Sequence, residues 1–108
     1  MHSEPEPDLV LLAPRDDFYE RELARPRDVL LAIELADTTL VRDRDVKLPL
    51  YARHGVPEAW LVDIEGRCLT VHRDPSPDGY ASVIVANDLR SLSPERLGGV
   101  SLDLSWLR

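Results

Sequence analysis

The stretch Val29-Leu-Leu-Ala-Ile-Glu-Leu-Ala36 decides the fold of this chain, because all of its residues but one are apolar. A short continuous apolar run of this kind is typical of a strand that is buried on both faces of a sheet. The exception, Glu34, lies deep inside the run. An ionised carboxylate in such a strand is costly unless it is paired or bound to a metal ion. Glu34 therefore needs a partner, either a cation or a basic side chain.

The spacing of apolar residues predicts the elements on either side of this central strand. Residues 8–13 are a second apolar run and predict another strand buried on both faces. Apolar residues then recur at helical spacing between Asp37-Thr-Thr39, which offers N-cap side chains, and Gly55. This pattern predicts a helix within residues 38–55, which Pro49 kinks or splits because proline cannot donate a backbone hydrogen bond.

The rest of the chain predicts antiparallel strands joined by turns. Two β-rich segments flank Glu65-Gly66 and predict a hairpin. We expect a single α/β (α+β) domain over residues 1–108, with a mixed sheet, helix on at least one face and a flexible tail at 1–6. The expected ranges are a connection at 15–27 with one turn of helix near Phe18 and Tyr19, hairpin strands at 59–64 and 68–73, a turn cluster at 74–79, a strand at 80–85, and a short last strand through Val100, Leu102 and Leu104, followed by Trp106 in the core.

Composition and charge narrow the classes of function. The 108 residues are 44% hydrophobic and 31% charged, which is ordinary for a globular domain. The N-terminus lacks the features of a signal peptide and no apolar run could span a bilayer, so we expect a cytoplasmic protein. The single cysteine, Cys68, is interpreted as a strand residue. The net charge of −7 opposes a grip on nucleic acid that relies on basic side chains alone.

Acidic residues and one lysine form a candidate constellation. Asp8 starts one predicted strand and Glu34 ends another, so their carboxylates converge at one sheet edge if the strands are neighbours. Converging carboxylates repel unless Mg²⁺ or Mn²⁺ lies between them. The following helix places Asp43, Lys47 and Tyr51 at i, i+4 and i+8, which directs Lys47 toward the carboxylates. Tyr51 is interpreted as helix packing.

Four motifs, in this order and with this spacing, resemble the Uma-type family of the PD-(D/E)xK nuclease superfamily. The resemblance runs from about Pro7 to the C-terminus and implies a restriction-endonuclease-like fold. The motifs are Pro7-Asp8, Leu31-Ala-Ile-Glu34 followed by Asp37-Thr-Thr39, Asp43-Arg-Asp-Val-Lys47, and Leu50-Tyr-Ala-Arg-His-Gly-Val-Pro-Glu-Ala-Trp-Leu-Val-Asp63.

The resemblance also implies roles for individual residues. Asp8 and Glu34 are expected to bind Mg²⁺ or Mn²⁺, and the backbone carbonyl of Leu35 is a further candidate ligand. The usual position of the superfamily's lysine, two residues after Glu34, holds Ala36. Lys47 is then the catalytic lysine, moved to the helix.

A fourth residue, Asp43, matches the family's helix aspartate and is expected to orient Lys47 or to hold a water on the metal. The expected activity is divalent-metal-dependent hydrolysis of DNA phosphodiester bonds in a bacterial cytosol. Alternatives stay open for single residues: Glu34 paired with an arginine, and Asp43 with Lys47 as an exposed ion pair. The group Arg42, Arg44, Lys47 and Arg53 reads as a solvated helix face that is also where a phosphate could be held.

Two rival functions follow from the same residues. One is a catalytically inactive remnant that acts as an oligomerising or partner-binding module, and the other is a hydrolase of a smaller phosphoester. Relatives carry a substantial segment before the Pro-Asp motif, which here begins at Pro7. That difference predicts an exposed apolar sheet surface, which a homodimer would cover.

Overall fold

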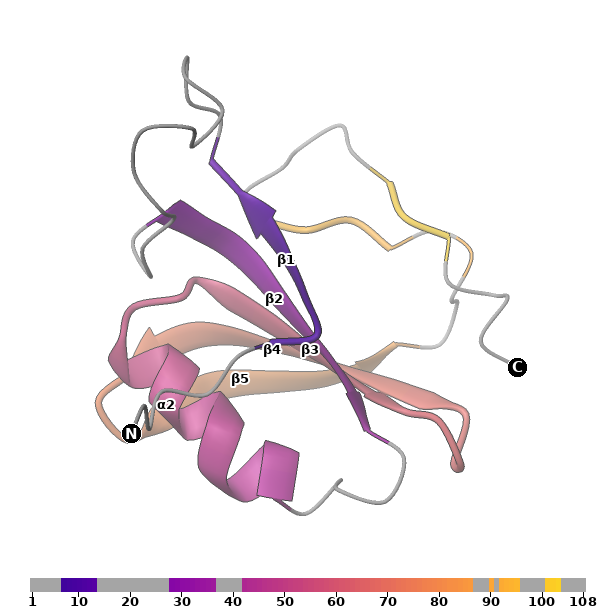
Figure 1. Ribbon diagram of the computed structural model, residues 1–108, viewed down its shortest axis with the longest axis horizontal. Helices are drawn as coiled ribbons and strands as arrows, with labels where there is room; N and C mark the ends of the chain where they lie inside the picture. The colour runs from indigo at the N-terminus through magenta and orange to yellow at the C-terminus, as the bar shows by residue number, and fades with distance from the viewer. Residues whose placement is uncertain are drawn as a thin grey trace.

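The computed structural model describes residues 7–13, 28–36, 42–86, 90, 92–95 and 101–103. Its centre is one five-stranded sheet with the strand order β1-β2-β3-β4-β5. A π-helical turn and a short α-helix lie between β2 and β3 in the sequence (Figure 1). The bounds are β1 Leu9–Leu12, β2 Val29–Ala36, η2 Asp43–Lys47, α2 Leu48–Arg53, β3 Glu58–Asp63, β4 Cys68–Ser76 and β5 Gly79–Ala86.

The sheet is mixed, as predicted. β1 pairs with β2 in the antiparallel sense, β2 with β3 in the parallel sense, and the remaining neighbours are antiparallel. The parallel pair requires a crossover, and α2 lies in that connection. Figure 1 shows α2 in front of one face of the sheet. The apolar run at 29–36 forms β2, an interior strand with a neighbour on each side, as its composition predicts.

Small side chains let α2 pack closely on the sheet. Ala32, Ala36 and Ala59 are fully buried, and they belong to one core cluster with Leu48 and Tyr51 of α2. Because alanine adds only a methyl group to each strand, the larger side chains of the helix have room to lie against β2 and β3. Side chains of Val56 and Leu61 complete the cluster. This face of β2 also carries Glu34, since side chains two residues apart share a face of a strand.

Larger apolar side chains form the opposite face. Trp60 is its largest buried member, and Leu92 and Leu102 pack there from outside the five strands. Those two residues are joined by an isolated antiparallel bridge with backbone hydrogen bonds in both directions. The other members of this cluster are Leu31, Ile33, Val62, Leu69 and Val71.

Pro49 splits the helical segment, as predicted, but the break precedes it. Residues 43–47 form a π-helical turn, and the α-helix begins at Leu48 with Pro49 in its first turn. Proline fits there because backbone N–H groups in the first turn have no partner within the helix. A π-turn is wider than an α-turn and is frequent at functional sites. Here it ends at Lys47, a predicted site residue.

Two predictions about strands need correction. The run at 8–13 does form a strand, but β1 lies at the edge of the sheet, and Leu9 and Val10 are 53% and 39% exposed. An edge strand has one neighbour only, so its apolar side chains are covered less than those of a central strand. The turn cluster predicted at 74–79 is shorter, because β4 continues to Ser76 beside β5.

Other predictions fall outside the described residues. These are the tail at 1–6, the turn of helix near Phe18 and Tyr19, the N-cap residues 37–39, and the packing of Trp106. Of the predicted last strand, Leu102 lies in the isolated bridge, whereas Val100 and Leu104 are not described.

The close packing of α2 on the sheet predicts that a larger side chain destabilises the protein more beneath the helix than on the exposed surface of the sheet. Ala59→Leu is expected to lower the free energy of unfolding by about 2 kcal/mol, because no space remains beneath the helix. The matched control Ala81→Leu, on the exposed surface of β5, should change it by less than about 0.5 kcal/mol. Urea unfolding followed by the fluorescence of buried Trp60 measures both. Equal stability of the two variants would contradict this account of the helix contact.

Candidate active site

Glu34 is the most constrained polar residue on the helix-covered face. Its side chain is about 1% exposed, and both of its carboxylate oxygens accept hydrogen bonds from the helical segment. The hydroxyl of Tyr51, on α2, donates to Oε1. The ammonium of Lys47, at the end of η2, donates to Oε2 at 3.2 Å. The partner of Glu34 is therefore a lysine together with a tyrosine, and an arginine is not among its described contacts.

Asp8 joins this site through the register of β1. Leu9 pairs with Ile33, so continuing the antiparallel register places Asp8 beside Glu34 on the same face. Asp8 Oδ2 also accepts a hydrogen bond of 2.7 Å from the backbone N–H of Leu35. This bond holds the Asp8 carboxylate at the end of β2. The register thus sets the two acidic residues beside each other where β1 begins.

The surroundings of Glu34 disfavour the ionised form of its carboxyl group. Burial raises the pKa of the Glu34 carboxyl above its ordinary value, and the nearby charge of Asp8 raises this pKa further. The hydrogen bonds from Tyr51 and Lys47, with the positive charge of Lys47, oppose that rise without cancelling it. The protein's own groups therefore compensate the buried negative charge only in part.

This donor set fits a small divalent cation. Among the described residues, no group of three or more His, Cys, Asp or Glu side chains gathers in one place. Mg²⁺, however, is usually bound by one or two carboxylates, with water and substrate phosphate completing its coordination. Asp8 and Glu34 supply that pair, and the incomplete compensation of Glu34 favours additional positive charge. A role for the Leu35 carbonyl, whose own amide faces Asp8, stays a prediction.

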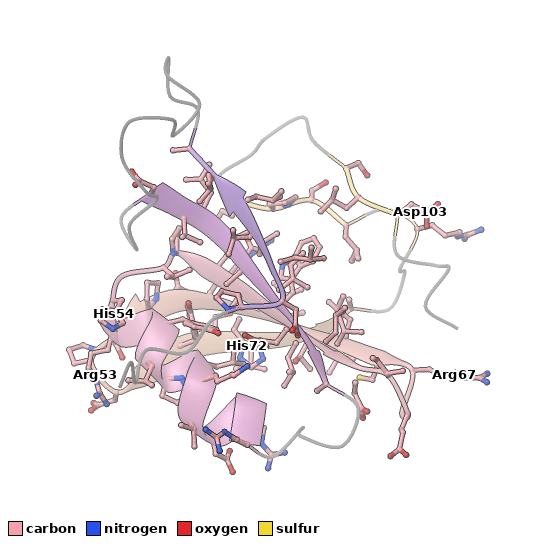
Figure 2. All side chains as sticks on the ribbon, viewed as in Figure 1. Arg53, His54, Arg67, His72 and Asp103 are labelled. Carbon is pink, nitrogen blue, oxygen red and sulfur yellow. The ribbon has the colours of Figure 1, made fainter. Side chains whose placement is uncertain are left out.

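The remaining basic residues of the predicted patch do not gather around Glu34. Arg44 pairs with Asp45 at 3.0 Å, and both side chains are more than half exposed. Figure 2 shows Arg53 and His54 at the far end of α2 and Arg67 at the tip of the β3–β4 hairpin. The backbone of η2 includes residue 43, but the predicted Asp43 side chain lies outside what the structure describes. Lys47 is the basic residue that the described contacts bring to the Glu34 carboxylate.

Sequence reasoning missed a second buried glutamate, on the opposite face. Glu58 is 0% exposed and accepts hydrogen bonds from Trp60 Nε1 at 2.6 Å and from the backbone N–H of Glu95 at 2.7 Å. Arg73 reaches Oε2 of the same carboxylate at 3.2 Å and also donates to the Ser93 carbonyl at 3.1 Å. The available signal was the hairpin register, which sets Glu58 directly opposite Arg73.

The two buried glutamates are expected to respond oppositely to neutralisation. Glu58→Gln turns an amide N–H₂ toward donors, so it should lower the free energy of unfolding by about 3 kcal/mol. Glu34→Gln should leave the metal-free protein at pH 7 as stable as the wild type or more stable, because the Tyr51 hydroxyl can accept from the new amide as well as donate, and the partly exposed Lys47 ammonium can turn to water. Thermal and urea unfolding in the presence of EDTA compare the three proteins.

The pH dependence of the Glu34 comparison has a definite sign. The pKa of Glu34 is raised on folding from about 4.5, so protonation favours the folded state. Its stabilising contribution is complete below that value and is lost as pH rises through the folded pKa. Relative to Glu34→Gln, the wild type should therefore become less stable as the pH rises above about 4.5. A difference that grows in the opposite direction would show that Lys47 and Tyr51 overcompensate the burial.

Comparison with known proteins gives one result. Residues 1–105 match the family model described as "Uma2: Putative restriction endonuclease". No curated protein matches the chain. The mixed sheet with one short helix is the α+β arrangement expected of the restriction-endonuclease-like fold. Within the described residues, no helix is long and apolar enough to cross a membrane.

Proposed function

This chain belongs to the Uma2 family, and we propose that it is a divalent-metal-dependent endonuclease that hydrolyses DNA phosphodiester bonds. The observation that carries the proposal is the contact of the Lys47 ammonium with the buried carboxylate of Glu34, beside Asp8. Two carboxylates and an ammonium thus lie close together, and a metal-assisted hydrolysis of a phosphodiester uses groups of these kinds. Family membership supports the nuclease class, and the acidic pair with the lysine supports the chemistry.

Each residue has a defined task in the proposed reaction. Asp8 and Glu34 would hold Mg²⁺ or Mn²⁺, which when bound supplies Lewis acidity toward a phosphate oxygen and acidifies water. Lys47 carries a positive charge that stabilises the negative charge developing on the phosphate. The Lys47 side chain is 23% exposed, so its ammonium can contact a substrate on the solvent side of the buried Glu34 carboxylate. Asp43 is proposed to orient Lys47 from the preceding turn of η2.

Lys47 also differs in type from the other basic residues of the chain. The 13 basic residues comprise one lysine, Lys47, and arginines at every other position. An ammonium is a compact point charge on a flexible stem, whereas a guanidinium is a planar fork that favours bidentate pairing. Lys47→Arg is therefore not a conservative change at this site.

The proposed function predicts metal-dependent nicking of supercoiled plasmid that requires Lys47. Lys47→Ala should reduce the nicking rate about 10²–10³-fold, because it removes charge stabilisation from the transition state. The matched control Arg67→Asn also removes one positive charge, but at the distant hairpin tip (Figure 2), and should keep the wild-type rate. Asn suits that position, where φ is +52°.

Gel assays with Mg²⁺, Mn²⁺ or EDTA, at low ionic strength because of the net charge of −7, measure this prediction. Nicking that persists in EDTA, or that is equal in wild type and Lys47→Ala, would refute the proposal. Hydrolysis of bis(p-nitrophenyl) phosphate without plasmid nicking would instead favour the small-phosphoester hydrolase.

A second candidate function, an oligomerising module, is favoured by strand β5. Val83, Ile84 and Val85 are 57%, 51% and 55% exposed in succession, and β5 lies at a sheet edge. The strand Gly79–Ala86 contains neither a charged residue nor a proline, the features that normally block edge pairing. Pairing with β5 of a second copy, antiparallel about a two-fold axis, would set apolar side chains against one another on both faces.

Ile84→Lys tests the homodimer that this strand predicts. A charge at the centre of the β5 pairing should convert a dimer to a monomer, because two lysines would meet across the two-fold axis. Sedimentation equilibrium of wild type and variant measures the change in mass, with Ser101→Lys at another exposed position as a surface control. A monomeric wild type at about 100 μM would exclude this mode of association.

A further inference from the structure

The two oxygens of the Glu34 carboxylate are held by groups of different kinds. Oε1 accepts from the hydroxyl of Tyr51, a neutral group on a residue that is 4% exposed. Oε2 accepts from the ammonium of Lys47, whose side chain is 23% exposed. One partner is therefore neutral and fixed in the core, and the other is charged and lies at the boundary with solvent.

From this asymmetry we infer that Tyr51 is a positioning residue for the metal site. By holding Oε1 it orients the carboxylate of Glu34 so that Oε2 is the oxygen presented to a divalent cation, and Lys47 withdraws from Oε2 when the cation binds. The inference rests on the proposed function only in requiring a cation at Asp8 and Glu34. It deepens that function by assigning a task to Tyr51 and an exchange of partners to Lys47.

Electrostatics explains why Lys47 is the partner that leaves. An ammonium and a divalent cation on one carboxylate oxygen repel each other, so they cannot share Oε2 at no cost. The hydroxyl of Tyr51 carries no net charge and can remain on Oε1. Groups that hold a ligating carboxylate from behind in this way commonly affect metal affinity.

Packing explains why Tyr51 can act as a fixed reference. It lies within α2 beside the buried Leu48 and Ala52, and it belongs to the cluster that contacts Ala32 and Ala36 of β2. These alanines flank Glu34 on the same face of the strand. The tyrosine ring has only two rotatable bonds, and this cluster surrounds it. Its hydroxyl is therefore aimed at Glu34 by the contact between helix and sheet.

The chain contains a matched control for Tyr51. Tyr80, on β5, is also packed against the same core cluster, and its hydroxyl donates to the backbone carbonyl of Val56 at 2.7 Å. Burial raises the pKa of Tyr80 well above its usual range, so its hydroxyl is a neutral donor too. Tyr80→Phe and Tyr51→Phe each delete one hydroxyl hydrogen bond beneath α2, but only the second bond ends on Glu34.

Mn²⁺ binding to the full chain, measured by the EPR signal of free Mn²⁺ without nucleic acid, tests the role of Tyr51. Tyr51→Phe should weaken Mn²⁺ binding about 10- to 100-fold, and Tyr80→Phe by less than about twofold. In a Glu34→Gln background, Tyr51→Phe should cause no further loss. Equal affinity of Tyr51→Phe and wild type, or equal losses in both tyrosine variants, would overturn the inference.

The withdrawal of Lys47 has its own spectroscopic test. Because Lys47 is the sole lysine, reductive methylation with ¹³C-formaldehyde places one labelled side chain at the site, with the N-terminal amine as internal reference. The dimethylated ammonium keeps its charge and one N–H donor. Saturating Mg²⁺ should shift the Lys47 resonance in wild type but not in Glu34→Gln. A resonance that is unchanged although Mn²⁺ binds would refute the exchange.

These outcomes separate the inference from the proposed function. A wild type that binds no Mn²⁺ overturns both. A wild type that binds Mn²⁺ with the expected dependence on Tyr51 but fails to nick plasmid supports the positioning role and refutes the nuclease.

Discussion

A carboxylate buried between a sheet and a helix is the constraint on which this structure depends. Glu34 lies in an interior strand, where neither water nor a neighbouring strand can satisfy its charge. The helical segment after β2 meets that need by delivering a phenol and an ammonium to separate oxygens. The position of α2, the π-turn before it and the small side chains beneath it all serve this delivery. The packing that fixes the helical segment on the sheet therefore also positions the partners of Glu34.

The second buried glutamate shows what a purely structural solution looks like. Glu58 receives an indole, a guanidinium and a backbone amide, and Arg73 also binds the Ser93 carbonyl. The bonds from the Glu95 amide and to the Ser93 carbonyl tie the segment 92–95 to the sheet, whereas the indole bond is made within β3. Glu34 has a different set of partners, and its pKa remains raised despite them. Besides a charged partner at the boundary with solvent, Glu34 has an acidic neighbour, Asp8.

Much of the fold could be predicted from the sequence because its signals are local. The apolar run containing Glu34, the turn residues Glu65-Gly66 and the position of Pro49 each act over a few residues, and β2, the β3–β4 hairpin and the split helix follow from them. The edge position of β1 could not be predicted, because an apolar run indicates a strand without stating how many neighbours it has. The extension of β4 to Ser76 is similar, since strand pairing with β5 overrides the turn preference of Asp74 and Pro75.

The candidate site could also be predicted from the sequence only in part. The meeting of Asp8, Glu34 and Lys47 was predictable, since it needs only neighbouring strands and a helix of the right phase. The bond from Tyr51 was not, because i+8 spacing gives the direction of a side chain and not the atom that its hydroxyl reaches. The role of Glu58 depended on Arg73 and on the amide of Glu95, contacts 15 and 37 residues away. Such long-range partners leave little trace in the residues around Glu58.

The edge position of β1 has a thermodynamic consequence. Asp8 precedes a four-residue strand with a single neighbour, whereas Glu34 belongs to the interior of the sheet. Peripheral strands detach at a lower free-energy cost than central ones. An ion that binds both carboxylates can bind only molecules in which β1 is paired with β2. By mass action, such an ion stabilises the paired state and makes detachment of β1 rarer. Ion binding at this site and detachment of the edge strand are thus coupled, since each makes the other less favourable.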